Sequence, residues 1–406
     1  MNLSIVLIGC FDTKGEAFSH LRTGILANGE RIITINTGVM GTTTDFPVDY
    51  ESDAVAQAAG QSIADLRTDG DRGRAIDVMG RGAATLLRQL VDSGRVKAVV
   101  GMGGGGGTSI ALAAMQAVPF GIPKLCLTTL ATKDLSRQIG HKDITLMPSV
   151  VDIAGLNSII TPLLEQAAAA ICAMSNVKPA VTHHSLGRVA VSMFGNTTAC
   201  VEQCTDLLKK QGYEVFAFHA NGIGGQTMES LIGEGYFDAI LDTTTTELAD
   251  DLCGGICSAS PDRLLAAGRR GIPQVVVPGC LDMVNFGHPD TVPTQFSNRI
   301  LYSWAPHVTL MRTDEADNEE LGRRLAQKLN QSRGPVTVVL PLAGLSQLDR
   351  EGGIFYYPAV NKVLFETIKS HVSQTVNVIE SAAHINDAAF SALLVDCLVD
   401  MIQKNK

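Results

Sequence analysis

A run of five consecutive glycines, Gly103–Gly107, is the feature of this sequence that points most clearly to chemistry. It follows the apolar run 96–100 and precedes a segment of helical periodicity that begins at Thr108. Glycine permits positive φ angles and lets a ligand approach the backbone, and a helix N-terminus offers free N–H groups to an anion. The run therefore predicts a phosphate-binding loop. Its expected ligand-binding residues are Gly101, Gly103, Gly104, Gly105, Gly106, Gly107 and Thr108.

Two familiar kinds of glycine loop do not fit this run. A P-loop has a lysine after its last glycine, where this chain has Thr108. A dinucleotide-binding loop is followed by a strand that ends in an acidic residue, but here that strand ends in Thr128 and Thr129. We keep Thr129 as a candidate ligand contact. A tight strand-to-helix crossover without a ligand is the structural alternative, although such crossovers rarely need five adjacent glycines.

A second glycine loop covers residues 219–227, and its candidate ligand-binding glycines are Gly222, Gly224 and Gly225. The strand that follows it ends at Asp242, at the spacing expected of a carboxylate that binds a ribose. Thr227 takes the place of the third glycine in that fingerprint. A nicotinamide-dependent oxidoreductase is therefore a minority interpretation.

Polar side chains follow several expected strands, which is where ligands bind in doubly wound folds. After the first strand come Asp12, Thr13 and Lys14, where Lys14 would pair with phosphate and Asp12 would hold Mg²⁺ through water. A capped turn is the structural alternative there. In the second half, hydroxyl groups follow a strand and would face phosphate or sugar; they belong to Thr243, Thr244 and Thr245.

The same reasoning gives the candidate catalytic residues, which are His219, Asp242, Glu247 and Arg312. Arg312 comes at a strand end, where a guanidinium can bind a carboxylate or phosphate through two hydrogen bonds. The structural alternative for Arg312 is a surface ion pair, and the structural alternative for Glu247 is a capping box at a helix start. No catalytic triad can be assigned from these residues.

The elements that must position these residues alternate between strands and helices in both halves of the chain. The predicted strands are 4–8, 31–36, 96–100, 124–128, 189–194, 214–219, 239–242, 274–277, 308–311 and 336–340. The predicted helices are 16–28, 71–93, 108–117, 151–174, 199–211, 227–234, 364–369 and 387–403. This alternation indicates an α/β protein with two Rossmann-like, doubly wound domains and mainly parallel sheets.

The alternation breaks at residues 176–185, which contain Pro179 and the pair His183-His184. That pair is more typical of a linker than of a metal site. We therefore expect an N-terminal domain over residues 1–180 with the first glycine loop and a C-terminal domain over 185–406 with the second. The ligand is expected in a cleft between the domains.

Composition excludes several classes of function. The 406 residues carry a formal net charge of −9 without a basic block, so nucleic acid is not an expected partner. No apolar run is long enough to cross a membrane, and the first residues lack the basic flank of a signal peptide. Nine scattered cysteines favour a reduced, cytoplasmic protein. Two pairs of cysteines, Cys200/Cys204 and Cys253/Cys257, have helical spacing and not the spacing of a zinc knuckle. We therefore expect buried thiols and no metal site.

Taken in order, these stretches resemble the Tm-one-like ATP-binding domain family, which has long counted as an uncharacterised protein family. The matching segments span essentially the whole chain and lie at 11–16, 107–108, 149–157, 193–198, 218–222, 241–250, 282–287, 310–313 and 384–387. A plant tomato mosaic virus resistance protein carries a similar region at its N-terminus. The resemblance implies two Rossmann-like subdomains, ATP binding and self-association, here expected as a dimer or tetramer. It implies no established reaction.

The chain departs from the family pattern at two places near the predicted phosphate site. The glycine loop of the family usually carries a serine where this chain has Gly105. After the strand that ends near Thr128, the family usually has an Ala-Ser-Gly-Asp-like turn, whereas residues 131–134 read Ala-Thr-Lys-Asp. Another phosphorylated or anionic ligand is therefore an alternative to ATP.

Three hypotheses follow from the sequence. The leading one is a cytoplasmic protein that binds ATP or another nucleotide, with Mg²⁺ as a further cofactor. The second is an enzyme that acts on a small acidic or phosphorylated metabolite in the interdomain cleft. The third is a scaffold that acts through protein contacts. The sequence leaves open whether the protein is an enzyme.

Overall fold

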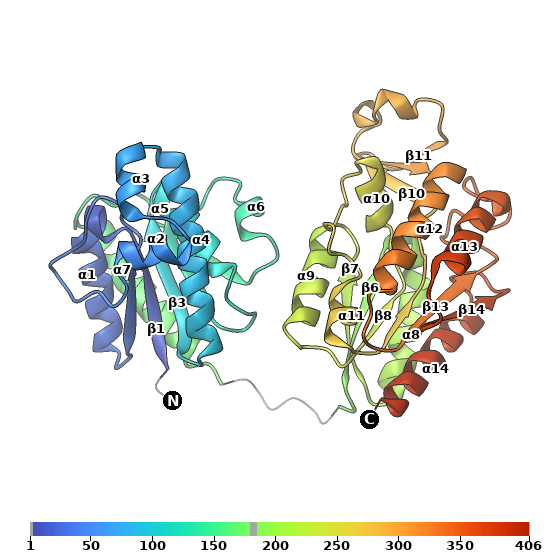
Figure 1. Ribbon diagram of the computed structural model, residues 1–406, viewed down its shortest axis with the longest axis horizontal. Coiled ribbons are helices and arrows are strands. Elements are labelled where there is room, and N and C mark those ends of the chain that lie inside the picture. The colour runs from blue at the N-terminus through green and yellow to red at the C-terminus, as the bar shows by residue number, and fades with distance from the viewer. Residues whose placement is uncertain (1–2, 179–184, 406) are drawn as a thin grey trace. The chain divides into compact units, whose positions relative to one another are not determined.

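The computed structural model describes residues 3–178 and 185–405 (Figure 1). The chain forms two compact units, residues 1–182 and 183–406, which are called the N-terminal and C-terminal domains below. Most of the segment where we predicted a boundary, including Pro179 and the pair His183-His184, lies outside the described residues. Within the described ranges, no helix is long and apolar enough to cross a membrane.

The N-terminal domain contains one parallel sheet of five strands in the order β2-β1-β3-β4-β5. The strands are β1 (Ser4–Gly9), β2 (Ile32–Asn36), β3 (Val96–Gly103), β4 (Lys124–Thr128) and β5 (Ile144–Pro148). The helices are α1 (Phe11–Ala27), α2 (Ser52–Ala58), α3 (Ile63–Asp69), α4 (Arg72–Asp92), α5 (Gly105–Met115), α6 (Ser136–Ile139) and α7 (Ile160–Ser175). Strands such as Ser4–Gly9 are buried throughout because helices cover both faces of the sheet.

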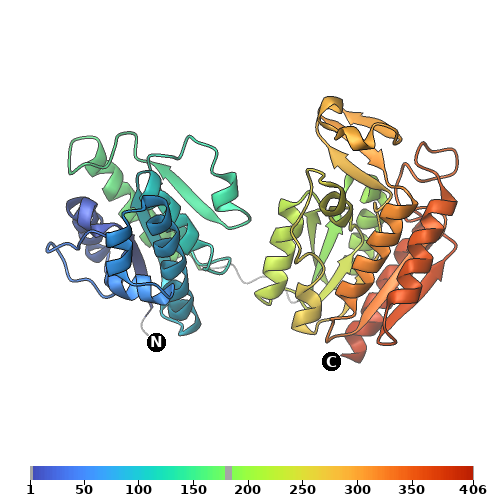
Figure 2. The ribbon, with the colours of Figure 1, turned by 45° about the horizontal axis from the view of Figure 1, so that its top comes forward.

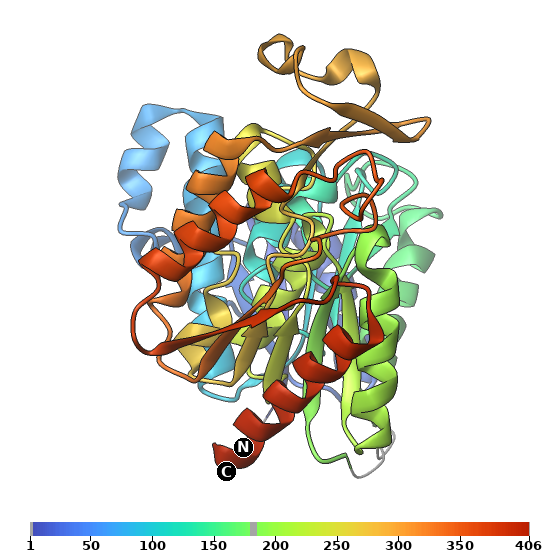
Figure 3. The same cartoon turned by 90° about the vertical axis from the view of Figure 1, so that its right-hand side faces the viewer.

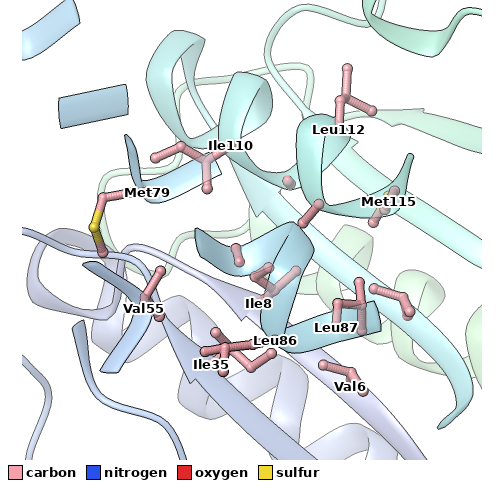
Figure 4. Packing of buried hydrophobic residues seen from close by; sticks show 14 of the residues in the cluster. Val6, Ile8, Ile35, Val55, Met79, Leu86, Leu87, Ile110, Leu112 and Met115 are labelled. Carbon is pink, nitrogen blue, oxygen red and sulfur yellow. The ribbon is translucent and has the colours of Figure 1, made fainter. Parts of the chain in front are cut away.

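Two apolar clusters hold the helices to the faces of this sheet. On one face, α1 and α7 pack on side chains such as Ile5 and Leu7 of β1. On the other face, α2, α4 and α5 pack on alternate residues of the same strand, Val6 and Ile8. Figure 4 shows this second cluster, with side chains of α4 and α5 against those of the strands. Loops at the ends of β1 and β3 thus lead to helices on opposite faces.

The C-terminal domain contains a parallel sheet of six strands in the order β14-β13-β9-β8-β6-β7. Its strands are β6 (Arg188–Met193), β7 (Glu214–His219), β8 (Ala239–Asp242), β9 (Gln274–Val276), β13 (Val336–Pro341) and β14 (Val376–Ser381). Read in chain order within each domain, both sheets have strand order 2-1-3-4-5, and the second adds one strand at the end. The predicted α/β architecture with mainly parallel sheets is confirmed.

Helices also cover both faces of the C-terminal sheet. One face carries α8 (Thr198–Lys210) and α14 (Ala388–Lys404), which lie side by side in Figure 3 as the green and red helices. The helices of the other face are α9 (Ile223–Gly233), α11 (Ala266–Arg270), α12 (Glu315–Leu329) and α13 (Pro358–His371). The short helix α10 (Glu247–Cys253) follows β8 and contacts α12.

The sequence predicted neither the edge strands β5 and β14 nor a small antiparallel sheet in the C-terminal domain. The strands of that small sheet are β10 (Met283–Phe286), β11 (Leu301–Ala305) and β12 (Val308–Arg312), in the order β10-β12-β11. Figure 2 shows it at one end of the C-terminal domain, coloured orange. We predicted a strand over 308–311 as part of the parallel sheet. The strand exists, but its partners are the antiparallel neighbours on either side.

Five helices begin three or more residues away from the predicted starts. Helix α1 begins at Phe11 and not at residue 16, and α13 begins at Pro358 and not at residue 364. Helix α5 begins at Gly105 and α9 at Ile223, because in both the glycine-rich segment is itself the first helical turn. Helix α7 begins only at Ile160, not at residue 151. There the Asn157 side chain accepts hydrogen bonds from the amides of Ile159 and Ile160, which stabilises a later helix start.

Candidate functional site

The candidate site lies at the point where the strand order of the N-terminal sheet reverses direction. From β1 the chain continues to β2 on one side of the sheet, and from β3 it continues to β4 and β5 on the other side. The switch point therefore lies between the adjacent strands β1 and β3. Parallel sheets of this kind bind ligands beyond the carboxyl ends of the strands at such a point, because the loops there diverge and leave a crevice. In this domain the two segments that leave these strands are residues 10–14, at the start of α1, and the glycine run at the start of α5.

A cavity of about 1080 Å³ occupies this position, which is the size of a typical small-molecule site. Its lining comes from Cys10 and the start of α1, from the ends of β3, β4 and β5 with the segments that follow β4 and β5, from the loop after β2, and from α3, α4 and α5. All of its lining residues lie between Cys10 and Asp152, within the N-terminal domain. The sequence-predicted residues among them are Asp12, Thr13, Lys14, Gly103, Gly104, Gly105, Gly106, Gly107 and Thr129.

The glycines of the first loop have two different roles. A methyl group on Gly103 would lie 2.7 Å from the Gly107 backbone, and one on Gly101 would lie 2.9 Å from Ala111 Cβ. These two glycines therefore allow α5 to pack closely against β3. Thr108 is fully buried, and its hydroxyl is 2.6 Å from that of Thr128. Among the described residues, Gly101 and Thr108 do not line the cavity.

The remaining glycines face the cavity at the N-terminus of α5. The first turn of an α-helix leaves its N–H groups without acceptors inside the helix, and here that turn is Gly105, Gly106 and Gly107. A methyl group on Gly105 would meet no atom within 4 Å. We had expected glycine to serve positive φ angles as well, but the described glycines with positive φ lie elsewhere in the chain. Space for an approaching group is what glycine provides here.

Arg72 supplies a positive charge beside this helix end, and the sequence analysis missed it. It is the first residue of α4 and lines the cavity. Its Nη2 lies 3.8 Å from the position of a methyl group on Gly106, so the guanidinium stands next to the exposed amides. The neighbouring Arg74 instead pairs with Asp69 on the surface. Guanidinium and helix N-terminus together favour a phosphate or carboxylate.

Lys14 and Asp12 line the cavity but are already engaged with the backbone. The Lys14 ammonium donates to the carbonyl of Ile153 at 2.5 Å, and Lys14 itself interrupts the helical geometry of α1 with φ −134° and ψ 25°. The Asp12 carboxylate accepts the Met40 amide at 3.0 Å. These side chains therefore hold the segments after β5 and β2 in place at the cavity wall.

The cavity rim contains a strained turn at the end of β5. Val150 has φ 64°, which β-branched residues rarely adopt, and the amide of Val151 donates to the Ser149 carbonyl across it at 2.7 Å. The Ser149 hydroxyl donates to the Val151 carbonyl at 2.7 Å and fixes the turn. Such strain costs about 1–3 kcal/mol and concentrates at ligand sites. The turn places Asp152 at the cavity.

The second glycine loop forms a helix end that the protein fills with its own carboxylate. Glu247 Oε1 accepts hydrogen bonds from the amides of Gly222 at 2.8 Å and Gly225 at 3.2 Å. A methyl group on Gly225 would lie 2.2 Å from Glu247 Oε2, and one on Gly224 would lie 1.9 Å from the His219 carbonyl oxygen. At the N-terminus of α9, the Glu247 carboxylate thus occupies the position that a bound anion would take.

Glu247 and Asp242, two of the candidate catalytic residues, belong to a buried charge network around Arg263. The Arg263 guanidinium is fully buried and contacts both carboxylates, with Nε 2.6 Å from Glu247 Oε2 and Nη2 2.7 Å from Asp242 Oδ1. It also pairs with Glu229 at 3.3 Å. Burial raises the pKa of Glu229 and of Glu247, against the opposing effect of Arg263. Sequence analysis missed Arg263 because no local motif marks it.

The switch point of the C-terminal sheet, between β6 and β8, is filled by side chains. The Thr197 hydroxyl is 2.7 Å from that of Thr244, and Thr243 donates to the Ser192 carbonyl. All four threonines that follow β8 are fully buried, so they contact the protein rather than solvent; they are Thr243, Thr244, Thr245 and Thr246. Near the start of α8, Trp304 of β11 lies 3.5 Å from the position of a methyl group on Gly195.

The other two candidate catalytic residues lie apart. Arg312 is buried, and it donates to the Phe355 carbonyl at 2.9 Å and to Asn361 Oδ1 at 2.7 Å. It is part of the fold rather than of a surface ion pair. His219 is exposed at the end of β7, and its ring lies 5.3 Å from that of Phe194. The four cysteines at helical spacing are free and buried.

Comparison with known proteins identifies the family. The N-terminal domain of the uncharacterised protein family UPF0261 matches residues 3–180, and its C-terminal domain matches residues 187–402. The chain belongs to family UPF0261. A UPF0261 protein of Clostridium tetani is 41% identical over 405 residues, with all of both chains covered. One from Rhizobium meliloti is 40% identical and covers 98% of each.

A plant relative belongs to the same group. The tomato mosaic virus resistance protein Tm-1 of Solanum lycopersicum is 37% identical over 343 residues, which cover 82% of this chain and 45% of that longer protein. The tomato mosaic virus susceptible protein tm-1 of the same plant is also 37% identical, over 342 residues. The Tm-1-like family resemblance seen in the sequence is therefore confirmed.

Solved structures give only distant likenesses. A putative UDP-N-acetylglucosamine 2-epimerase from Listeria monocytogenes has a TM-score of 0.22 and 10% identity, with 68% of this chain and 79% of that one covered. The complex of S. aureus MnaA with UDP has a TM-score of 0.22 and 9% identity, with 92% and 94% covered. At these scores the likeness carries no information about the ligand of UPF0261 proteins.

Proposed function

We propose that this UPF0261 protein binds ATP or another nucleotide in the cavity of its N-terminal domain. The observation that carries the proposal is the open helix end of α5, whose first-turn amides border a cavity of about 1080 Å³ at the switch point of the sheet. The phosphate group would accept hydrogen bonds from the amides of Gly105, Gly106 and Gly107. Arg72 would pair with it from the side of α4.

The rest of the cavity suits the less polar part of a nucleotide. Apolar side chains from four elements line it beyond the glycine run; they are Val39, Met40, Leu66, Ile76 and Ile110. A site with one polar end and one apolar wall is typical of small-molecule pockets. ATP is the nucleotide that the family resemblance implies, and no reaction follows from these residues.

Binding titrations test the proposal. We expect Mg·ATP, and to a lesser degree ADP and inorganic phosphate, to raise the melting temperature of the full chain and to bind in calorimetry. Arg72→Ala should weaken binding by about tenfold or more, since a charge-assisted hydrogen bond contributes about 1.5–3 kcal/mol. Arg74→Ala is the matched control, because Arg74 lies in the same helical turn and pairs with Asp69 on the surface. Absence of binding by every nucleotide and by phosphate would refute the proposal.

A further inference from the structure

The charges that line the cavity are balanced, which restricts the ligand it can accept. Three lining side chains are acidic and three are basic, and they are Asp12, Asp71, Asp152, Lys14, Arg67 and Arg72. Two of the basic side chains already donate hydrogen bonds to the backbone: Lys14 to the Ile153 carbonyl, and Arg67 to the Val39 carbonyl at 2.6 Å. The six charges sum to zero, so the lining side chains cannot neutralise the several negative charges of a nucleoside triphosphate.

Asp152 adds a specific difficulty for a bare phosphate. A methyl group on Gly104, the residue that precedes α5, would lie 4.0 Å from Asp152 Oδ1 and 3.9 Å from Thr129 Oγ1. Within the described chain, the Asp152 carboxylate accepts one hydrogen bond, from the amide of Ile153 at 2.9 Å from Oδ1. A carboxylate thus stands beside the helix end where the phosphate would bind, and two like charges this close repel each other.

A divalent cation resolves this repulsion. Mg²⁺ prefers oxygen ligands, and it is usually held by one or two carboxylates together with substrate phosphates and water. Among the described residues, no group of three or more histidine, cysteine or acidic side chains could hold a metal on its own. The ion would therefore enter with the ligand. Asp12, our first candidate for Mg²⁺, is instead bonded to the Met40 amide.

We propose that the cavity takes its phosphorylated ligand as the Mg²⁺ complex, and that Asp152, assisted by the Thr129 hydroxyl, imposes this requirement. Asp152 and Thr129 would contact the ion directly or through its water molecules, and Arg72 would pair with the phosphate. The inference depends on the proposed nucleotide site and names the form of the ligand that this site accepts.

Calorimetry with ATP in the presence of Mg²⁺ or of a chelator tests the inference on the full chain. We expect wild-type protein to bind Mg·ATP at least about tenfold more tightly than free ATP, because the ion replaces repulsion by attraction at Asp152. Asp152→Asn removes that charge. The variant should bind free ATP more tightly than wild type and Mg·ATP more weakly, so that the preference for the Mg²⁺ complex largely disappears.

Two further variants complete the test. Thr129→Val should weaken only Mg·ATP, by about three- to tenfold, because it removes a neutral oxygen ligand. Asp77→Asn should leave both affinities unchanged, since Asp77 is an exposed residue of α4 that pairs with Arg81. Melting temperatures of all variants confirm that they are folded.

Other results would overturn the inference. Equal weakening of free ATP and Mg·ATP by Asp152→Asn would mean that the carboxylate accepts a hydrogen bond from the ligand instead of facing a metal ion. Unchanged affinities would mean that Asp152 has no part in binding. Wild-type protein that binds nucleotide without any preference for Mg²⁺ would refute the inference alone, whereas wild-type protein that binds no nucleotide or phosphate would refute the proposed site itself.

Discussion

The two domains share a strand order but differ at the end of the sheet where ligands bind. In the N-terminal domain, glycines and a strained turn border an open cavity at the switch point. In the C-terminal domain, the corresponding loops carry buried threonines, and a nearby helix end is occupied by Glu247. The same topology can therefore present a binding site or close it, and the side chains that follow the strands decide which.

The two glycine-rich helix ends show this difference most directly. The first turns of α5 and α9 both contain glycines, and both have backbone amides without acceptors inside the helix. At α9 a carboxylate of the protein occupies that position, and Arg263 neutralises it. At α5 the position opens to the cavity. A glycine-rich sequence alone does not distinguish these two cases.

The largest expected effect concerns the charge network that closes α9. Arg263→Ala should lower the free energy of unfolding of the C-terminal domain by about 3–5 kcal/mol, because it leaves buried carboxylates without their partner. Urea denaturation followed by circular dichroism measures this. Arg269→Ala is the control, since Arg269 forms an exposed pair with Asp262. A loss below about 1 kcal/mol would show that the network is not what holds this region together.

A smaller effect is expected when α5 is made to resemble α9. Gly105→Asp places a carboxylate at the first position of the helix, where there is room for it and where the helix dipole stabilises it by about 0.3–1 kcal/mol. The variant should keep or gain thermal stability and lose nucleotide and phosphate affinity by about a hundredfold through charge repulsion.

Gly105→Ser is the matched control for this experiment. Its side chain is close in size to that of aspartate and adds no charge. We expect it to fold normally and to bind with affinity equal to or higher than wild type. Retained binding in Gly105→Asp would mean that the ligand does not lie at the end of α5.

The smallest expected effect is a pH dependence confined to the C-terminal domain. Burial raises the pKa of Asp250 and of Asp349, each to about 7 from a usual value of 3.8. When burial raises the pKa of an acid in the folded state, the protonated acid contributes to the stability of the fold. This stabilisation is complete below about pH 4 and is lost as pH rises through 7. The slope is at most about 1.4 kcal/mol per pH unit for each group.

Denaturation of wild type and Asp349→Asn at pH 5.5 and 7.5 tests this dependence. The wild-type C-terminal domain should lose stability between the two values, and Asp349→Asn should lose less, since asparagine stays neutral in the same position. Asp396→Asn, an exposed residue of α14, should behave as wild type. Equal slopes in wild type and Asp349→Asn would contradict the assignment.

Most strands of both sheets could be predicted from the sequence, because buried parallel strands are short apolar runs followed by helical periodicity. The first strand, for example, was expected at 4–8 and lies at Ser4–Gly9. The helix starts at Gly105 and Ile223 could not be predicted. Glycine has a low helix propensity, and these turns form only because they pack against strands or bind Glu247.

The N-terminal site was partly predictable for a similar reason. Residues directly after a strand, such as Asp12 and the glycine run, are placed by the topology, and they do line the cavity. Arg72 and Asp152 come from segments some 30 to 50 residues away from the glycine run in sequence, and only the packing of α4 and the turn after β5 brings them to it. No local motif marks Arg72, and Asp152 lies in a segment that matches the family but shows no pattern of a ligand site.

The close approach of β3 to α5 has a consequence for any large-scale survey of variants. Replacing Gly101 or Gly103 forces atoms of the strand against the helix, so such variants should disappear from a screen that scores cellular abundance. An acidic replacement of Gly105 meets open space and should pass that screen, yet fail one that scores capture by an immobilised ligand. Within one uninterrupted stretch of a single residue type, the two screens would thus separate the residues that build the protein from those that serve its ligand.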